Sequence, residues 1–528
     1  MRRFLILLSI LVLGLLSPSA RAETADDAFA ALGSPGFDSI RRGVEQLTLS
    51  GHPRTMAVID ALRDGRLYVR GDRTVFIKTA AGTYTAAATG EPAADAAGLK
   101  PIRINNAVRG AIDASVGALR LFAPDAATRL EGAETVFRSH DPAMSQPLSM
   151  AIARETDPTV KRRMEQAAAS AVLFTPDAGE PARLNAVAVL RARGDIEARG
   201  LLATLTDQPP AVADAITLAM VAIDYSLQLW SFAQSVYYGL SLGSVLLLAA
   251  AGLAITFGVM GIINMAHGEM VMIGAYVTFM VQQAMRAHAP GLYGGSLLIA
   301  VPLAFATAGI IGIAIERCLI RFLYGRPLET LLATWCLSLV LQQAIRSLFG
   351  ANNRDVDTPS WMSGAAQLGG LTLTWNRMYI ILFAVIVLAA LMAVLRFTAL
   401  GLRMRAVTQN RRMAAAMGIR TPWVDALTFG LGSGVAGIAG VALSQIDNVS
   451  PNLGQGYIID SFMVVVFGGV GNLWGTVVGA LTLGIVNKFL EPVAGAVLGK
   501  IVVLVLLILF IQRRPRGMFP LKGRAVEA

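Results

Sequence analysis

The sequence has 528 residues and contains only two cysteines and four histidines. Both cysteines, Cys318 and Cys336, lie in the apolar second part of the chain. The first part therefore cannot form disulfides and has to be stabilised by a packed core. No pair of cysteines or histidines has the spacing of metal ligands. We therefore expect neither a metal nor another cofactor.

Charged residues are also scarce. They make up 15% of the chain, against about 25% in a typical soluble protein, while 55% of the residues are hydrophobic. The first 225 residues contain 25 Lys+Arg and 25 Asp+Glu, whereas residues 226–528 contain 20 and 10. The net charge of +10 thus belongs to the part with the long apolar runs. A basic excess on apolar segments indicates membrane topology rather than nucleic-acid binding.

Motifs of enzymes and nucleotide-binding proteins occur only in the wrong context. A nucleophile-elbow pattern surrounds Ser241, but it lies inside an apolar helix with no strand before it. An intramembrane serine hydrolase built on Ser241 and His267 is the alternative from a different class of proteins. A dinucleotide fingerprint overlaps a glycine series whose three- and four-residue spacing is typical of helix packing: Gly430, Gly434, Gly437 and Gly440. We expect no catalytic residue in this chain.

The amino terminus has the three zones of a signal peptide. Arg2 and Arg3 precede an apolar stretch at 4–16, and Ala20 and Ala22 have the small side chains that a signal peptidase requires. The stretch is too short to span a membrane easily as a helix. We predict a signal peptide at 1–22 and an extracytoplasmic domain at 23–225. An uncleaved anchor is the alternative, and it leaves the export of that domain unchanged.

The predicted exported domain has two parts. Strand-like runs separated by short turns predict a small β meander at about 66–89. Short amphipathic helices follow at about 104–220, and their recurring breaks predict HEAT-like repeats, which stack to bury faces that no single helix pair could bury. An irregular helical domain is the alternative. Either surface suits contacts with other proteins rather than chemistry.

Residues 226–528 are predicted to form a polytopic membrane domain. The apolar segments long enough to span are 232–257, 266–285, 294–316, 328–349, 378–396, 422–444 and 493–512. A further stretch, 458–490, is interrupted by the glycine-rich sequence at 468–472. We predict a mainly α fold with about 8–9 transmembrane segments, one broken or re-entrant. Non-helical backbone inside a membrane is tolerated only when it is buried or lines a cavity, so the break is a candidate functional feature.

The basic residues orient this domain. Fourteen of its 20 lysines and arginines lie after the third segment, between the fifth and sixth, or in the tail. These three groups of basic residues lie on the same face of the membrane if the amino-terminal domain lies on the opposite face. The positive-inside rule makes the face with the basic residues cytoplasmic. We predict a multi-pass protein of the bacterial inner membrane with a cytoplasmic carboxyl terminus. An odd number of crossings follows, so 458–490 crosses twice or not at all.

Three groups of residues are candidates for function. Asn264, His267 and Glu269 place an amide, an imidazole and a carboxylate near the cytoplasmic mouth; helix capping by Asn264 is the alternative. The loop 396–421 contains a predicted docking helix at 408–417; a basic anchor on anionic lipid is the alternative. The polar residues of the last group are rich in neutral amides, which suits an uncharged solute: Gln445, Asp447, Asn448, Asp460, Asn472, Asn487 and Glu491.

Three strings, in this order, resemble the permeases of branched-chain amino acid (LivH-type) ABC importers. They are ITFGVMGIINMAHGE at 255–269, GLRMRAVTQNRRMAAAMGI at 401–419 and VFGGVGNLWGTVVG at 466–479, and the resemblance covers about 230–520. The long exported region and the string QNRRMAA at 409–415 also resemble the branch that contains the permease subunit of the urea transporter. The resemblance implies a homologous second permease, two ATP-binding subunits on the cytoplasmic side and a periplasmic substrate-binding protein as partners.

The three strings contain the candidate site residues. Translocation-path candidates are Asn264, His267, Glu269, Gly469, Gly471 and Asn472. The ATPase-coupling region contains Arg403, Arg405, Gln409, Asn410, Arg411, Ala415 and Gly418. Arg412 stands where ABC importers in general carry an acidic residue, which leaves the docking contacts open. We predict a non-enzymatic permease that translocates urea, with ATP hydrolysed by its partners. The alternative within transport is a branched-chain amino acid permease, although a zwitterion should favour paired charges in the path, and the sequence shows no convincing pair.

Overall fold

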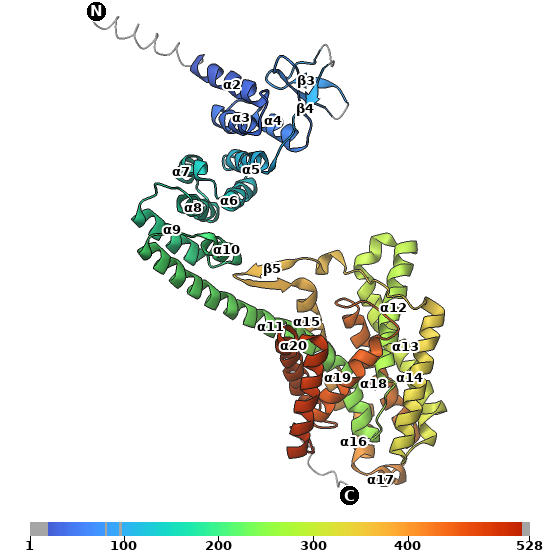
Figure 1. The fold of residues 1–528 in the computed structure, drawn as a ribbon. Helices are drawn as coiled ribbons and strands as arrows, with labels where there is room; N and C mark the ends of the chain where they lie inside the picture. Colours follow the sequence, from blue (N-terminus) through green and yellow to red (C-terminus); the bar gives the residue numbers. More distant parts are fainter. Residues whose placement is uncertain (1–18, 80–81, 94–97, 520–528) are drawn as a thin grey trace, which may run out of the picture. The chain divides into compact units, whose positions relative to one another are not determined.

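The computed structural model describes residues 19–79, 82–93 and 98–519, which fall into two compact units with the boundary between Gln228 and Leu229 (Figure 1). Helices dominate both units and strands are few, which confirms the predicted mainly α fold. Most of the predicted signal peptide, residues 1–18, lies outside the described residues. Its last residues, 19–22, belong to the first described helix, α2.

The first unit begins with three helices and a small antiparallel sheet. Its strands lie in the order β3-β2-β1-β4, with Leu67 opposite Ile77. Both side chains are buried together with Val58 and Leu62 of α4, because alternate strand residues face the helices. The elements are α2 (Ser19–Leu32), α3 (Phe37–Ser50), α4 (Thr55–Arg63), β1 (Leu67–Val69), β2 (Val75–Lys78), β3 (Tyr84–Ala86) and β4 (Lys100–Pro101).

Short capped helices complete the first unit. Asn105, Asp125 and Asp195 each accept a hydrogen bond from the backbone N–H three residues later, at 2.9, 2.7 and 2.8 Å, and so start a helix. The helices share one core around Phe137 and Met164. The HEAT-like arrangement stays a prediction. These elements are α5 (Asn106–Arg120), α6 (Ala126–Ser139), η1 (Pro142–Met144), α7 (Ser145–Arg154), α8 (Pro158–Leu173), α9 (Glu180–Arg193) and α10 (Ile196–Thr204).

The second unit is a helical bundle. Six of its described helical stretches are long and apolar enough to cross a membrane: Pro210–Met260, Pro290–Phe322, Pro327–Phe349, Trp375–Phe397, Thr421–Leu443 and Leu473–Arg513. Its helices are α11 (Pro210–Met260), which begins before the boundary, α12 (His267–His288), α13 (Ser296–Cys318), α14 (Pro327–Phe349), α15 (Trp375–Phe397), α16 (Ala399–Gln409), α17 (Arg411–Ala416), α18 (Thr421–Leu443), α19 (Leu453–Gly468) and α20 (Leu473–Arg513). Three short 3-10 helices, η2 (Pro290–Gly295), η3 (Ile320–Phe322) and η4 (Ser360–Met362), lie in the connections.

A two-stranded hairpin that the sequence did not predict lies between η4 and α15. It pairs β5 (Ala365–Leu368) with β6 (Leu371–Thr374). The amide of Gln234 in α11 bonds to both backbone groups of Thr372, and the Tyr237 hydroxyl donates to the carbonyl of Thr374. These bonds fix the hairpin to the start of the bundle, at the end opposite α16 and α17 (Figure 1).

The helices of the bundle divide into an inner and an outer set. In the most apolar 18-residue stretch of α18, 89% of the residues are buried, whereas the share is 22% in the corresponding stretches of α14 and α15 and 17% in that of α20. The outer helices therefore expose large apolar side chains along their length, among them Leu332, Val385 and Leu506. A soluble protein rarely leaves so much apolar surface uncovered, and a bilayer would cover it.

Glycine allows α18 to lie at the centre of the bundle. A Cβ added at Gly440 would come within 2.0 Å of the carbonyl oxygen of Val271 in α12, and one at Gly437 within 2.6 Å of that of Ala304 in α13. Small residues thus let the three backbones approach one another closely. The interpretation of this glycine series as helix packing is confirmed.

The chain leaves helical geometry at two places near its end. The break at 468–472 separates α19 from α20, and Asn472 caps α20 by accepting hydrogen bonds from the N–H groups of Trp474 and Gly475 at 3.0 and 3.3 Å. The second break lies within α20 at Gly495, where φ is 75° and ψ is 166°. It divides α20 near the point where the sequence predicted a separate segment at 493–512.

The predicted single helix at 408–417 is wrong. The structure has α16 and α17 instead, separated at Asn410, whose φ and ψ are −154° and 100°. The cause is local, because the Asn410 side chain accepts a hydrogen bond from the N–H of Met413 at 2.9 Å and thereby caps a new helix. Gly418 follows α17 with a φ of 84°.

Candidate functional site

A cluster of polar side chains lies deep within the second unit, where α12 begins. Asn264, His267 and Glu269 are each only 1% exposed, so their side chains are buried among the helices, and their place at a cytoplasmic mouth stays a prediction. The Nε2 atom of His267 lies 2.9 Å from the carbonyl oxygen of Ala249 in α11. Asn264 accepts a hydrogen bond from the N–H of Ala266 at 3.0 Å, which closes the turn before α12; the cap position of α12 is Ala266, so Asn264 does not cap this helix.

Glu269 contacts a different helix. Its Oε1 atom accepts hydrogen bonds from the Ser338 hydroxyl and the Gln342 amide of α14, both at 2.8 Å. The sequence analysis missed Ser338 and Gln342. The sequence pattern could have identified them, because polar residues recur every four positions along the largely apolar α14, at Thr330, Thr334, Ser338 and Gln342. These four are the buried residues of α14. We call Asn264, His267, Glu269, Ser338 and Gln342 the central polar cluster.

Two atoms of the central polar cluster lack a hydrogen-bond partner among the described residues. They are Nδ1 of His267 and Oε2 of Glu269, and both are buried. The Ser241 hydroxyl likewise has no partner in the part of the chain that the structure describes. A serine nucleophile needs a hydrogen-bonded base, and His267 does not serve Ser241 as one. The geometry thus gives no support to a hydrolase.

Gly469, Gly471 and Asn472 lie apart from the central polar cluster, in the turn between α19 and α20. A Cβ at Gly469 would lie 2.8 Å from the carbonyl oxygen of Phe519, and Asn472 Nδ2 donates to that same oxygen at 3.1 Å. Gly471 packs against Gly258 near the end of α11. The two groups of path candidates thus occupy different levels of the bundle, and their role in a path stays a prediction.

The segment predicted to couple to an ATPase is held against the bundle by an ion pair. Arg411 in α17 binds Asp425 in α18 with two hydrogen bonds, one of them 3.2 Å from Nη1 to Oδ1. The Asp425 side chain is fully buried, whereas that of Arg411 is 43% exposed. The Tyr324 ring lies 5.0 Å from the Arg411 guanidinium. Arg411 therefore faces inward, and its partner Asp425 was missed by the sequence analysis.

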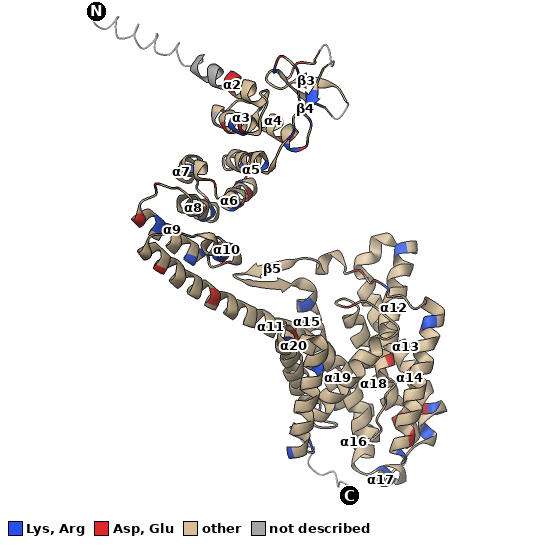
Figure 2. Cartoon of the chain, in the orientation of Figure 1, with Lys and Arg blue, Asp and Glu red and all other residues tan. Residues whose placement is uncertain are grey.

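The other predicted coupling residues leave a surface for contact. Arg403, Gln409, Asn410, Ala415 and Gly418 are exposed, as are Met413 and Met417 at 61% and 77%. Arg405 is also exposed and donates to the backbone carbonyl of Leu395. Figure 2 shows basic residues gathered at this end of the unit and few charges along the middle of the bundle. Arg317 belongs to this end as well, because its guanidinium lies 4.4 Å from the Trp423 ring at the start of α18.

A cavity of about 360 Å³ lies between α19 and the second break of α20. An ion pair forms one of its walls, with Lys500 Nζ 2.9 Å from Asp460 Oδ2. The sequence analysis named Asp460 but not its partner. Further lining residues are Asp447, Asn452, Tyr457, Asn487, Lys488 and Glu491. Paired charges, which the sequence did not show, are thus present in the membrane unit.

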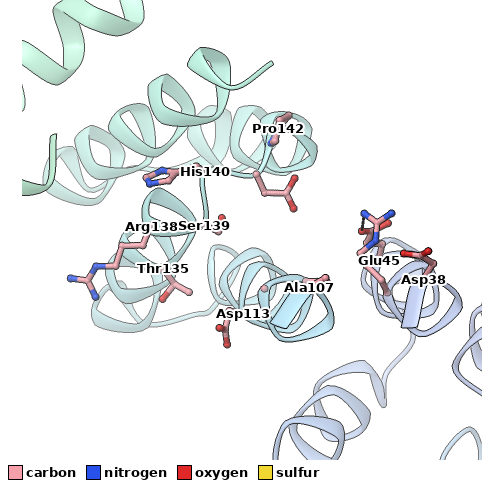
Figure 3. Close-up of a pocket in the computed structure, with 13 residues that line it drawn as sticks. Asp38, Glu45, Ala107, Asp113, Thr135, Arg138, Ser139, His140 and Pro142 are labelled. Carbon is pink, nitrogen blue, oxygen red and sulfur yellow. Dashed lines mark hydrogen bonds and ion pairs between the residues drawn. The ribbon is translucent and has the colours of Figure 1, made fainter. Parts of the chain in front are cut away.

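The first unit contains a wide hollow of about 820 Å³ between α3, α5 and α6 (Figure 3). Three of its six charged side chains form ion pairs, since Arg41 pairs with Glu45 at 3.2 Å and Arg138 with Glu197 at 2.9 Å. Burial lowers the pKa of His140 below its ordinary value, and its ring stacks on Phe174. These side chains lie around an open hollow rather than converging on one point, so the geometry does not indicate a small-solute site there.

Comparisons with known proteins agree with the architecture of the second unit. The family model described as "Branched-chain amino acid transport system / permease component" matches residues 235–511. The high-affinity branched-chain amino acid transport system permease protein LivH of Escherichia coli K12 is 32% identical over 302 residues, which cover 56% of this chain and 97% of LivH. The corresponding protein BraD of Pseudomonas aeruginosa is 28% identical over 296 residues, or 55% and 96% of the two chains.

A more distant similarity links the chain to the ribose import permease protein RbsC of Bacillus subtilis, at 29% identity over 114 residues, which cover 20% of this chain and 35% of RbsC. No solved structure matches at the same level of significance. The family match covers more than half of the chain and runs from within α11 to within α20. The chain therefore belongs to the family of permease components of branched-chain amino acid transport systems.

Proposed function

We propose that this chain is the membrane-spanning permease subunit of an ATP-driven ABC importer that translocates a branched-chain amino acid. The observation that carries the proposal is the family match over residues 235–511, which form a bundle of long apolar helices. The chain itself is proposed to have no catalytic role, with ATP hydrolysed by partner subunits.

We propose nine crossings of the bacterial inner membrane. α11, α12, α13, α14, α15, α18 and α19 each supply one, and the two halves of α20 supply two more. An odd number agrees with an exported domain at 23–225, behind a signal peptide at 1–22, and a cytoplasmic carboxyl terminus. The basic end of the bundle supports this orientation, because positive loops stay in the cytoplasm (Figure 2). HEAT-like repeats in the exported domain belong to the same proposal.

The cytoplasmic end is proposed to contact two ATP-binding subunits through α16 and α17. Exposed Met413 and Met417 suit a contact with another protein, because their flexible apolar side chains adapt to a partner surface. Arg403, Gln409 and Ala415 are exposed in the same two helices. Arg411 is proposed to position α17 through Asp425 rather than to touch the ATPase. A homologous second permease and a periplasmic binding protein would complete the transporter.

The central polar cluster is proposed to face the translocation path. Ionisable residues are costly to bury within a membrane, and those found there usually have a function. The Glu269 carboxylate and the His267 imidazole each have one buried atom without a hydrogen-bond partner among the described residues, so we infer a functional role for both. Nδ1 of His267 and Oε2 of Glu269 could be satisfied by a passing solute or its water. The turn with Gly469, Gly471 and Asn472 is proposed to lie at the cytoplasmic end of that path.

The choice of solute rests on two observations that point in different directions. The names of LivH and BraD, which match almost over their whole length, favour a branched-chain amino acid, and so does the Asp460–Lys500 pair. Urea is the second candidate, because the long amino-terminal region and the string at 409–415 resemble the urea branch of the family. The relatives account for only 55–56% of this chain, which leaves room for a distinct branch.

Uptake by the complete transporter tests the proposal. The chain is reconstituted in vesicles with its second permease, ATP-binding subunits and binding protein, and accumulation of radiolabelled leucine and urea is measured with and without ATP. ATP-dependent leucine accumulation supports the main proposal, and ATP-dependent urea accumulation alone replaces it with the second candidate. Accumulation of neither would refute both. Vesicles that lack the ATP-binding subunits serve as the control.

A further inference from the structure

The α19–α20 cavity combines a buried carboxylate with a reachable cation. The Asp460 side chain is 5% exposed, and that of Lys500 is 49% exposed. Lys500 occupies only Oδ2 of Asp460. The other oxygen, Oδ1, is buried and has no hydrogen-bond partner among the residues described here. An unmatched carboxylate oxygen is costly to bury, so a donor that reaches Oδ1 would bind favourably.

The cavity has space beside this ion pair. A Cβ added at Gly456, one turn before Asp460, would meet nothing within 4 Å in the described part of the chain. Gly495, at the break in α20, is equally open. Lys500 Nζ also lies 3.4 Å from the carbonyl oxygen of Gly456, so the open space borders both charged groups. A small solute can therefore approach the carboxylate and the ammonium together.

We propose that this cavity is a solute site in which Asp460 Oδ1 accepts an N–H of the solute while Lys500 Nζ donates to its oxygen. The inference rests on the proposed transport function and names the residues that recognise the solute. Urea and α-amino acids share this chemistry, because each has N–H donors and an oxygen acceptor joined through one or two carbons. Asp447, Lys488 and Glu491 also line the cavity, but Lys488 pairs with Glu491 at 2.5 Å and Asp447 accepts from Tyr457 at 3.4 Å.

The ion pair explains how such a site can exist in an empty transporter. Opposite charges keep the wall neutral when no solute is present, which limits the cost of a carboxylate in apolar surroundings. A solute with donor and acceptor ends adds bonds to both groups without changing the net charge. Gly495, where the two proposed crossings of α20 meet, also lines the cavity and leaves open space beside it.

The test measures ATP-dependent uptake of leucine and urea by the reconstituted transporter with Asp460→Asn. We expect leucine uptake to fall about 10- to 100-fold, because the ammonium loses a charged acceptor. Urea uptake should fall only about threefold, because the asparagine carbonyl still accepts a neutral N–H. The matched control is Glu329→Gln, an exposed carboxylate paired with Arg326 outside the cavity, which should leave uptake unchanged. The solute that the wild-type transporter accumulates identifies which of the two chemistries occupies the site.

Two further variants separate solute binding from folding. Gly456→Leu should fill the cavity and reduce uptake, while Gly456→Ala should reduce it less and both should keep the wild-type thermal unfolding temperature. The charge reversal Asp460→Lys with Lys500→Asp restores an ion pair but exchanges donor and acceptor. If the pair only holds α19 to α20, the reversed pair restores uptake; if it binds solute, uptake stays low.

The outcomes are distinguishable. Wild-type uptake in Asp460→Asn and Gly456→Leu, or full rescue by the reversed pair, overturns this inference and leaves the proposed function intact. Uptake of neither solute by the wild-type transporter overturns the proposed substrates and the inference with them. Reduced uptake in both variants, with the Glu329→Gln control unchanged, supports the site.

Discussion

Replacing Arg411 with methionine tests whether this residue positions the coupling segment. The change removes the two hydrogen bonds to Asp425 and leaves a fully buried carboxylate without its partner. Breaking a buried ion pair in this way costs about 3–5 kcal/mol when water is excluded. Because the Arg411 side chain is 43% exposed, water can enter the vacated place, and we expect about 2–3 kcal/mol. Docked α17 would then be disfavoured by roughly 30- to 140-fold.

The assay compares ATP hydrolysis and solute uptake in the reconstituted transporter. Arg411→Met should still insert and assemble, but solute-stimulated ATP hydrolysis and uptake should fall together. The double variant Arg411→Met with Asp425→Leu removes the stranded charge, so it should recover a large part of both activities. A single variant with wild-type activity would refute the reasoning. A double variant no better than the single one would show that Arg411 acts by direct contact with the ATPase.

Three further predictions follow from the described contacts. Gly440→Leu should prevent α18 from packing on Val271 and lower the unfolding temperature in detergent, whereas Gly456→Ala, which meets open space, should not. Arg129 holds the pKa of Glu155 at about 2, below its ordinary 4.5, so this pair stabilises the first unit above pH 4.5 by about 2 kcal/mol and the contribution is lost as pH falls toward 2. Hydrogen exchange of α6 and α8 should show this loss in the full-length protein, and Glu155→Gln should abolish the pH dependence. The orientation is tested with cysteines introduced after the exposed Cys318 and Cys336 have been replaced by serine. A cysteine at the exposed Met413 should react with an impermeant thiol reagent only from the cytoplasmic side, and one at the exposed Leu368 only from outside. The reverse pattern would contradict the proposed orientation.

The sequence was sufficient for features that depend on long runs of similar residues. The length of the apolar runs located the helices of the bundle. The spacing of the glycines identified the packing face of α18, where a Cβ added to any of these glycines would lie close to the main chain of a neighbouring helix. It failed where one side chain redirects the backbone. Asn410 divides the coupling segment by capping α17, and the β5–β6 hairpin depends on Gln234 and Tyr237, which are about 137 residues away in the chain.

Candidate residues were recognised individually, but their partners were not. The sequence identified as candidates several polar residues in apolar surroundings, namely Asn264, His267, Glu269 and Asp460. Their contacts join helices far apart in the sequence, as with Gln342 and Glu269, 73 positions apart, or Lys500 and Asp460, 40 positions apart. Periodicity describes one helix at a time, so it could have revealed the polar stripe of α14 but not which acid that stripe meets. For the same reason the sequence showed no internal charge pair.

The glycine contacts of α18 also limit how this chain can change during evolution. At Gly437 and Gly440 even a single methyl group collides with a neighbouring main chain, so glycine is almost the only residue that these positions tolerate. On α15 and the second half of α20, exposed Val385, Ile386 and Leu506 can exchange with any side chain of similar hydrophobicity. Drift should therefore erase the similarity of the outer helices first. Distant members of the family are therefore best detected by sequence comparisons that give the glycine positions of α18 more weight than the leucine and valine positions of the outer helices.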